Sequence, residues 1–130
     1  MEEVVKFLKE AETYYLGTVE NGKPDIRPFG TVNIFEGKVY IQTGRNKNVY
    51  KQIKEDSNIS ICTFLNGKWI RIYAEAIEDD RIEAEEALLN AYPSLQNMYK
   101  AGDGNTVVFY LKNVTATISS FTEAPVNIEF

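Results

Sequence analysis

The stretch Ile59–Asp80, ISICTFLNGKWIRIYAEAIEDD, contains the clearest structural signal in the chain. Apolar residues alternate with others on both sides of Asn66-Gly67, a dipeptide that strongly favours a two-residue hairpin turn. The pattern predicts two antiparallel strands, Asn58–Leu65 and Lys68–Glu78.

The second of these strands has two different faces, because successive side chains of a strand point to opposite sides. One face is apolar and consists of Ile70, Ile72, Ala74 and Ala76. The other face is amphipathic and consists of Trp69, Arg71, Tyr73 and Glu75. The amphipathic face is expected either to face solvent or to contact a partner chain or a ligand.

Similar signals precede this hairpin. Asn21-Gly22 joins a predicted strand Thr13–Glu20 to a return strand Lys23–Phe35, which two prolines bend or place at an edge. Glu36-Gly37 then leads into a short strand, Lys38–Thr43. These three successive strands are predicted to form an antiparallel meander.

Helical patterns alternate with the strands. Asn46 and Asn48 are candidate N-caps of a helix that follows the third strand. Asp80 and Glu83 have capping-box spacing and predict the start of an acidic helix, in which Ile82 faces inward. Leu88, Leu89 and Tyr92 of this helix are also expected to face inward.

The two ends of the chain complete the prediction. Glu2–Ala11 is an amphipathic helix, Thr106–Ser119 is a long final strand, and Phe121–Phe130 is a tail. We count about six strands, mostly in hairpins, and find no βαβ repeat. The expected fold is mainly β: a six-stranded antiparallel barrel with flanking helices, in a single domain of residues 1–130.

Composition excludes several classes of protein. The 130 residues carry a net charge of −5, which argues against a general nucleic-acid binder. There is no histidine, so Ser-His-Asp triads and histidine metal sites are excluded, and no metal site is expected. Cys62 is the only cysteine and is expected to be a buried small residue in a protein of a reducing compartment. No membrane-length apolar run occurs, so we expect a cytoplasmic protein.

A basic segment stands out in this acidic chain. Gly37–Ile53, GKVYIQTGRNKNVYKQI, passes from a strand through Gly44 into a helix start. From Thr43 to Lys54 the only charged residues are the basic Arg45, Lys47, Lys51 and Lys54. Backbone N–H groups, the positive end of the helix dipole and cationic side chains could bind an anion there. A surface basic helix with an ordinary cap explains the segment equally well.

A second cation is expected near this segment. Arg27, within DIRPFGTV, lies on the neighbouring strand of the predicted meander, which would bring it near Lys47. An arginine fork and a lysine, together with Gln42 and Thr43, suit one phosphate group and several polar contacts. No GxGxxG or GxxxxGK[ST] sequence occurs. The pattern therefore favours a phosphorylated cofactor, which would supply the chemistry that a chain without histidine lacks.

The order of these segments resembles the FMN-binding split-barrel superfamily, in the pyridoxamine 5′-phosphate oxidase-like group near its nitroimidazole-resistance-type branch. The resemblance rests on an N-terminal helix and five segments: YYLGTVENGKPDIRPFG, GKVYIQTGRNKNVYKQI, ISICTFLNGKWIRIYAEAIEDD, YPSLQNMY and VVFYLKNVTATISSF. It implies a split-barrel homodimer with two FMN sites at the subunit interface.

The resemblance also implies roles for individual residues. The residues expected along the flavin or its phosphate are Arg27, Pro28 and Phe29. Those expected at the ribityl and phosphate portions are Gln42, Thr43, Lys47 and Asn48. Trp69 and Arg71 match the strand that approaches the dimer interface and the flavin. The chain lacks the C-terminal substrate-binding segment of the true pyridoxamine-phosphate oxidases, so their reaction is not expected.

Two functions from different classes follow. The first is a small FMN-dependent oxidoreductase that acts on an unknown small molecule. The second is a non-catalytic carrier or sensor that binds a flavin, or another anionic cofactor such as haem or F420, in the same pocket.

Overall fold

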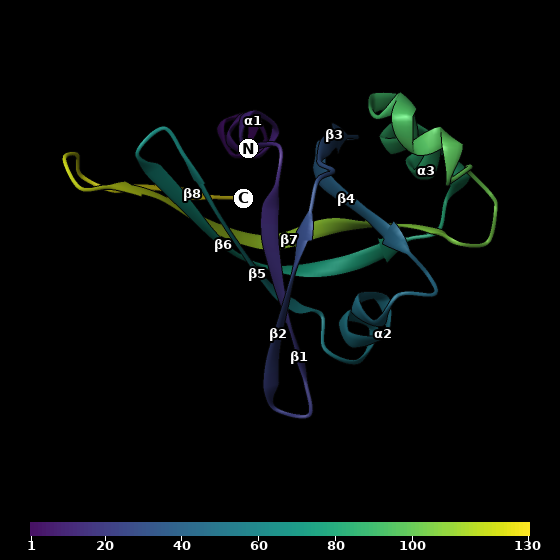
Figure 1. Ribbon diagram of the computed structural model, residues 1–130. Coiled ribbons are helices and arrows are strands. Elements are labelled where there is room, and N and C mark those ends of the chain that lie inside the picture. The colour runs from purple at the N-terminus through teal and green to yellow at the C-terminus, as the bar shows by residue number, and fades with distance from the viewer.

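Eight strands form one antiparallel sheet in the computed structural model, which describes residues 1–130 (Figure 1). The strands are β1 (Tyr14–Glu20), β2 (Lys23–Phe29), β3 (Asn33–Phe35), β4 (Lys38–Gly44), β5 (Asn58–Leu65), β6 (Lys68–Asp79), β7 (Thr106–Ser120) and β8 (Val126–Glu129). Their order is β2-β1-β5-β6-β7-β4-β3, and β8 pairs with β7. The mainly-β class with flanking helices is confirmed.

The strand count exceeds the predicted six for two reasons. The expected return strand Lys23–Phe35 is two strands, β2 and β3, which pair with β1 and β4 respectively. The expected tail contains β8, which pairs with β7 from Thr115 to Ile118. The three-strand meander was therefore wrong: β1 pairs with β2 and β5, and β4 pairs with β3 and β7.

The link between β2 and β3 forces the sheet to curl. These strands form opposite edges of the sheet, yet only Gly30, Thr31 and Val32 separate them in sequence. Four Cα–Cα steps span at most about 15 Å, so the two edges must come close together. The sheet therefore closes into a barrel through the chain itself rather than through a hydrogen-bonded strand pair, and it remains split at this seam.

The central strands follow the predicted alternation. Ile70, Ile72, Ala74 and Ala76 of β6 are buried, as are Ile59 and Ile61 of β5. The opposite faces of both strands are exposed or half-buried. Cys62 lies on that opposite face and is half-buried, so the expectation of a fully buried cysteine was wrong.

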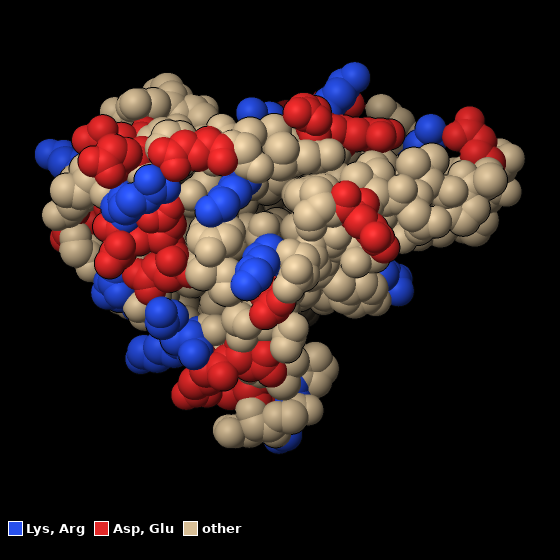
Figure 2. Space-filling view, turned by 180° about the vertical axis from the view of Figure 1, so that it is seen from behind, with Lys and Arg blue, Asp and Glu red and all other residues tan.

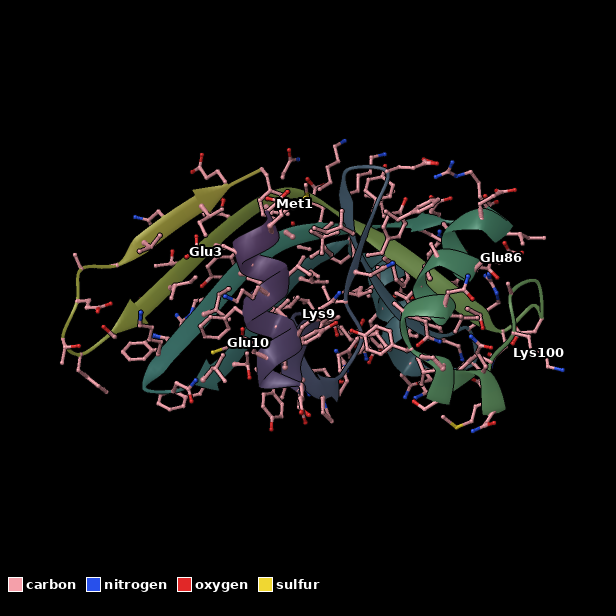
Figure 3. All side chains as sticks on the ribbon, turned by 90° about the horizontal axis from the view of Figure 1, so that it is seen from above. Met1, Glu3, Lys9, Glu10, Glu86 and Lys100 are labelled. Atoms are coloured by element: carbon pink, nitrogen blue, oxygen red, sulfur yellow. The ribbon has the colours of Figure 1, made fainter.

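Three α-helices and a short 3₁₀ helix flank the sheet. They are α1 (Glu2–Ala11), α2 (Asn48–Glu55), α3 (Ile82–Ala91) and η1 (Pro93–Asn97). Seen from above, α1 lies across the strands, whereas α3 lies beside the other end of the barrel (Figure 3). α1 buries Val4, Val5, Phe7 and Leu8 in the main core. A smaller core joins α3 to β4 and β7 through Leu88, Leu89, Tyr40 and Val108.

The predicted helix caps were wrong. α2 begins after Lys47, which has an extended backbone, and neither Asn46 nor Asn48 caps the helix with its side chain. α3 begins after Arg81, again without a side-chain cap. In both places the preceding strand and its turn fix the chain, so a side-chain cap is not required.

The start of α3 shows what replaces the expected capping box. β6 continues to Asp79, whose carboxylate accepts hydrogen bonds from the Arg81 backbone N–H at 3.1 Å and from Tyr40 Oη at 2.7 Å. Ile82 lies at the first position of α3 and is 51% exposed, so its expected inward orientation was also wrong. None of the helices combines the length and the apolar composition that a membrane-spanning helix requires.

Candidate functional site

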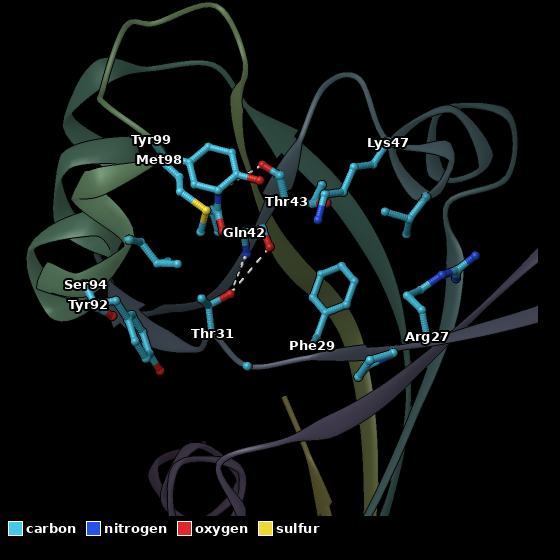
Figure 4. Close-up of a pocket in the computed structure, with 14 residues that line it drawn as sticks. Arg27, Phe29, Thr31, Gln42, Thr43, Lys47, Tyr92, Ser94, Met98 and Tyr99 are labelled. Carbon is cyan, nitrogen blue, oxygen red and sulfur yellow. Dashed lines mark hydrogen bonds between the residues drawn. The ribbon is translucent and has the colours of Figure 1, made fainter.

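A cavity of about 360 Å³ lies at the seam of the barrel. Its walls come from the end of β2 and the link to β3, from β4, from the start of α2, and from residues 92–99, which contain η1 and are called the η1 segment. Figure 4 shows Lys47 and Arg27 on one side of the cavity, and Tyr92, Ser94, Met98 and Tyr99 on the other. The cavity thus has a cationic side and a mostly apolar side.

Lys47 contributes an unpaired charge. It is the residue before α2, its side chain is exposed toward the cavity, and it forms no ion pair within 4.0 Å. The adjacent helix start has no side-chain cap and carries the positive end of the helix dipole. A phosphate group placed there would meet a cation and backbone N–H donors together.

Arg27 lines the same cavity but its guanidinium is already engaged. Its Nη1 donates to Thr18 Oγ1 at 2.7 Å and to the Leu16 carbonyl at 3.2 Å. Its Nη2 donates to Gln52 Oε1 at 2.8 Å and to Asp25 Oδ2 at 3.0 Å. The hydrogen bond from Gln52 and then the charge of Arg27 lower the pKa of the Asp25 carboxyl. Arg27 is therefore held in one orientation, with only its Nε–H free of a protein partner.

Sequence reasoning brought Arg27 and Lys47 together by an incorrect route. Arg27 is on β2, at one edge of the sheet, whereas Lys47 follows β4, which lies next to the other edge, so β2 and β4 are not neighbours. They meet at the cavity because the barrel curls. The basic residues in and beside the segment Gly37–Ile53 are Lys38, Arg45, Lys47, Lys51 and Lys54, and only Lys47 lines the cavity.

Two of the other cations, Arg45 and Lys54, pair with one carboxylate instead. Arg45 Nη2 lies 3.1 Å from Glu78 Oε2, and Lys54 Nζ lies 3.2 Å from Glu78 Oε1. Tyr50 Oη donates to Glu78 Oε1 at 3.0 Å and accepts from Arg45 Nη1 at 2.6 Å. This cluster anchors both ends of α2 to the end of β6.

The floor of the cavity is held by hydrogen bonds to the link between β2 and β3. Tyr14 Oη donates to the Thr31 carbonyl at 2.6 Å, and the Gln42 backbone N–H donates to Thr31 Oγ1 at 3.0 Å. Tyr92 Oη both accepts from the Val32 N–H and donates to the Val32 carbonyl, each at 2.9 Å. These contacts fix the seam and tie the η1 segment to it.

The apolar wall is formed by Leu95, Met98 and Tyr99 of the η1 segment. Tyr99 comes very close to the end of β4: a Cβ at Gly44 would lie 3.2 Å from its hydroxyl oxygen and 3.0 Å from Asn46 Oδ1. Glycine at this position therefore allows the η1 segment to approach the cavity.

Six of the nine residues that the sequence suggested as cofactor ligands line the cavity: Arg27, Pro28, Phe29, Gln42, Thr43 and Lys47. Asn48 follows Lys47 but does not line it, and neither Trp69 nor Arg71 does. Trp69 packs instead against Phe121, with ring centroids 5.1 Å apart, and Arg71 is exposed on the outer face of β6.

Sequence reasoning missed the opposite wall and part of the floor. The missed lining residues are Gly30, Thr31, Val49, Tyr92, Ser94, Leu95, Met98 and Tyr99. Five of them belong to the segment YPSLQNMY, whose two tyrosines and methionine are notable, although nothing in the sequence shows that this segment reaches the cavity. The structure contains no group of three or more His, Cys, Asp or Glu side chains that could hold a metal ion.

Comparison with known proteins agrees with this geometry. The sequence pattern of the pyridoxamine 5′-phosphate oxidase family matches residues 1–113. The chain belongs to that family. A crystal structure of a NimC/NimA family protein from Clostridium acetobutylicum is 37% identical, with a TM-score of 0.97 over 100% of this chain and 92% of that one. Within the pyridoxamine 5′-phosphate oxidase family, and so within the FMN-binding split-barrel superfamily, the chain therefore lies in the nitroimidazole-resistance-type branch.

Two less similar solved structures share the fold. General stress protein 26 from Bacillus anthracis is 19% identical, with a TM-score of 0.72 over 98% of each chain. A protein related to general stress protein 26, of the pyridoxinephosphate oxidase family, from Clostridium acetobutylicum is 14% identical, with a TM-score of 0.69 over 99% of this chain and 93% of that one. No curated protein matches the sequence.

Proposed function

We propose that this chain is an FMN-binding flavoprotein that acts as an oxidoreductase on an unknown small molecule. The observation that carries the proposal is the cavity at the seam, where cationic residues from two separate segments, Arg27 and Lys47, line one side. Its family typically binds flavin, which gives the proposal a second and independent support.

The residues around the cavity fit FMN. Lys47 and the uncapped start of α2 would bind the phosphate, and the free Nε–H of Arg27 would add one directed donor. Gln42 and Thr43 offer polar groups for the ribityl chain, and Phe29 offers an apolar surface for the ring. A volume of about 360 Å³ is within the range of small-molecule sites, which begins near 300 Å³.

FMN, when bound, supplies hydride or electron transfer, which this chain has no side chain to supply. The chain itself would anchor the phosphate, orient the ring along the cavity and exclude water from its apolar side. Among the lining residues, the titratable groups are Arg27, Lys47 and the phenols of Tyr92 and Tyr99. We assign none of these as a general acid or base.

The same observation favours a second candidate function, a non-catalytic flavin carrier. A pocket without a carboxylate, imidazole or thiol could hold a flavin and perform no turnover. Haem or F420 in place of FMN belongs to this alternative, because each would also present an anionic group to Lys47.

We further propose that two copies of the chain pair through the outer face of the sheet. Directly opposed residues of β1, β5 and β6 place a set of side chains on this face: Tyr15, Gly17, Ser60, Cys62, Phe64, Trp69, Arg71 and Tyr73. Glu75, paired with Asn58, lies at the end of the same face, so Arg71 and Glu75 are its charged residues on these strands. Pro28 lines the cavity and is paired with Tyr15, so the face borders the cavity. Trp69 and Arg71 would therefore reach a flavin only in a neighbouring copy.

The decisive experiment identifies the bound cofactor. Purified protein is expected to be yellow, or to become so with added FMN, and mass spectrometry of the ligand released by denaturation is expected to find FMN. Protein that stays colourless and does not alter the absorbance of added FMN would contradict the proposal. Steady-state oxidation of NADH or NADPH with an electron acceptor then separates an enzyme from a carrier, because only the enzyme turns over.

A further inference from the structure

Gln52 is a buried polar residue that no part of the proposed cofactor site uses directly. It lies on α2, one turn beyond the helix start, and is 2% exposed. It does not line the cavity. Burying an amide has a cost unless each of its polar atoms has a hydrogen-bond partner. The hydrogen-bond partners of Gln52 therefore show which parts of the structure it connects.

All the hydrogen bonds of the Gln52 side chain go to the β1–β2 hairpin. Its Oε1 accepts from Arg27 Nη2 at 2.8 Å and also from Thr18 Oγ1. Its Nε2 donates to Glu20 Oε2 at 2.9 Å and to Asp25 Oδ2 at 3.2 Å. One side chain thus joins α2 to both strands of the hairpin.

This connection matters because the two cavity cations come from the two elements that it joins. Lys47 directly precedes α2, and Arg27 is on β2. No strand pairing joins β2 to β4, the strand that leads into α2, because β2 pairs only with β1. Gln52 holds the Arg27 guanidinium from the helix, and Thr18 and Asp25 hold it from the hairpin. Thr18 and Asp25 also contact Gln52, which links the two sets of bonds.

We propose that Gln52 is the positioning residue of the phosphate site: it fixes Arg27 on the hairpin relative to Lys47 at the start of α2. This inference rests on the proposed FMN site and concerns its specificity. A fixed separation between the two cations favours a ligand that carries a phosphate over the same ligand without one. Gln52 acts through Arg27 and does not touch the ligand itself.

The test compares two flavins that differ only in the phosphate group. Dissociation constants for FMN and for riboflavin are measured by flavin fluorescence for the wild type and for Gln52→Met, which keeps a similar shape. We expect Gln52→Met to raise the FMN dissociation constant roughly tenfold, because hydrogen bonds to a charged group are lost. We expect riboflavin affinity to change by less than about twofold, since a positioning role affects only the phosphate end.

A second set of variants tests whether the effect passes through Arg27. In an Arg27→Met background, Gln52→Met should add little to the loss of FMN affinity, because the group that it positions is absent. Glu55→Gln, an exposed change on the same helix without a hydrogen-bond or ion-pair partner, should leave both affinities unchanged. If Gln52→Met does not fold, Thr18→Val removes another hydrogen bond to the same guanidinium and should weaken FMN selectively.

The outcomes separate this inference from the proposed function. Wild-type protein that prefers FMN to riboflavin, together with a Gln52→Met variant of unchanged preference, would overturn the positioning role and leave the flavin site standing. Equal weakening of both flavins would also overturn it, since that result indicates a general loss of structure. A wild type that binds neither flavin would overturn both.

Discussion

Lys47 and Lys51 are two lysines four residues apart, and they differ in what surrounds them. Lys47 lines the cavity and has no ion-pair partner, whereas Lys51 is exposed on α2 away from the cavity. Lys47→Ala should weaken FMN binding by roughly 1.5–3 kcal/mol, because a charge-assisted hydrogen bond to the phosphate is lost. Lys51→Ala is the matched control and should retain wild-type affinity in the same fluorescence titration. Equal affinities in both variants would remove Lys47 from the site.

Asp79 gives the protein a predictable response to acid. Hydrogen bonds from Arg81, and a further one from Tyr40, lower the pKa of Asp79 to about 2 from its usual 3.8. A lowered pKa means that the folded protein favours the carboxylate, so this contribution to stability is present above about pH 4 and is lost as the pH falls toward 2. Because Arg81 is half-exposed, we expect a contribution on the order of 1 kcal/mol.

The measurement is the free energy of unfolding in urea between pH 5 and about pH 2.5. Asp79→Asn should lower it at pH 5 and reduce its fall toward low pH. Asp80→Asn is the control, because Asp80 is exposed and makes no ion pair or side-chain hydrogen bond. Identical pH profiles for the wild type and Asp79→Asn would show that the hydrogen bonds to Asp79 do not contribute.

The strands show which elements could be predicted from the sequence. Asn66-Gly67 fixed the β5–β6 hairpin because its two halves are adjacent in the chain and pair in a defined register. The segment Lys23–Phe35 could not be divided in the same way, since both of its halves have strand character. Their partners, β1 and β4, are set by the curl of the whole sheet, which no local pattern encodes.

In the candidate site, too, some residues could be suspected from local sequence, whereas others are placed only by tertiary packing. Arg27, Gln42 and Lys47 belong to segments whose polar residues interrupt an otherwise apolar or acidic sequence, so their grouping could be suspected. Tyr92 and Met98 could not be placed, because η1 reaches the cavity only through the packing of α3 and the contact of Tyr92 with the seam. Such approaches depend on tertiary structure, and residue type alone does not reveal them.

Helix α2 should depend on Glu78 for its attachment to the sheet. Burial alone would raise the pKa of Glu78, but hydrogen bonds from Lys54, Tyr50 and Arg45 together lower it, so the carboxylate stays charged. Glu78→Gln should lower the free energy of unfolding by about 1–2 kcal/mol, since both cations lose their charged partner but remain partly in water. Thermal unfolding measures this, and Glu55→Gln on the same helix should have no effect. A Glu78→Gln midpoint equal to wild type would contradict the anchoring role.

The molecule as a whole distributes its charge unevenly. Charged side chains of both signs crowd the side where α3 lies, whereas the projecting arm of the β7–β8 hairpin is mostly uncharged in the view from behind (Figure 2). The outer face of β1, β5 and β6 continues this pattern, with Phe64 62% exposed and Tyr73 54% exposed. A face on which exposed aromatic side chains surround an arginine is typical of an interaction surface.

If that face joins two copies, a charge placed in its middle should separate them, because an interface core excludes unpaired charge. Tyr73→Glu is expected to shift sedimentation from a dimer toward the monomer of 14.8 kDa, and Trp69→Ala should loosen the dimer less severely. Ile82→Glu is the matched control, since Ile82 is similarly exposed but lies on α3, outside the face. It should sediment as the wild type does. A dimer that persists in Tyr73→Glu at low micromolar concentration, or a wild type that is monomeric throughout a concentration series, would show that this face does not pair two copies.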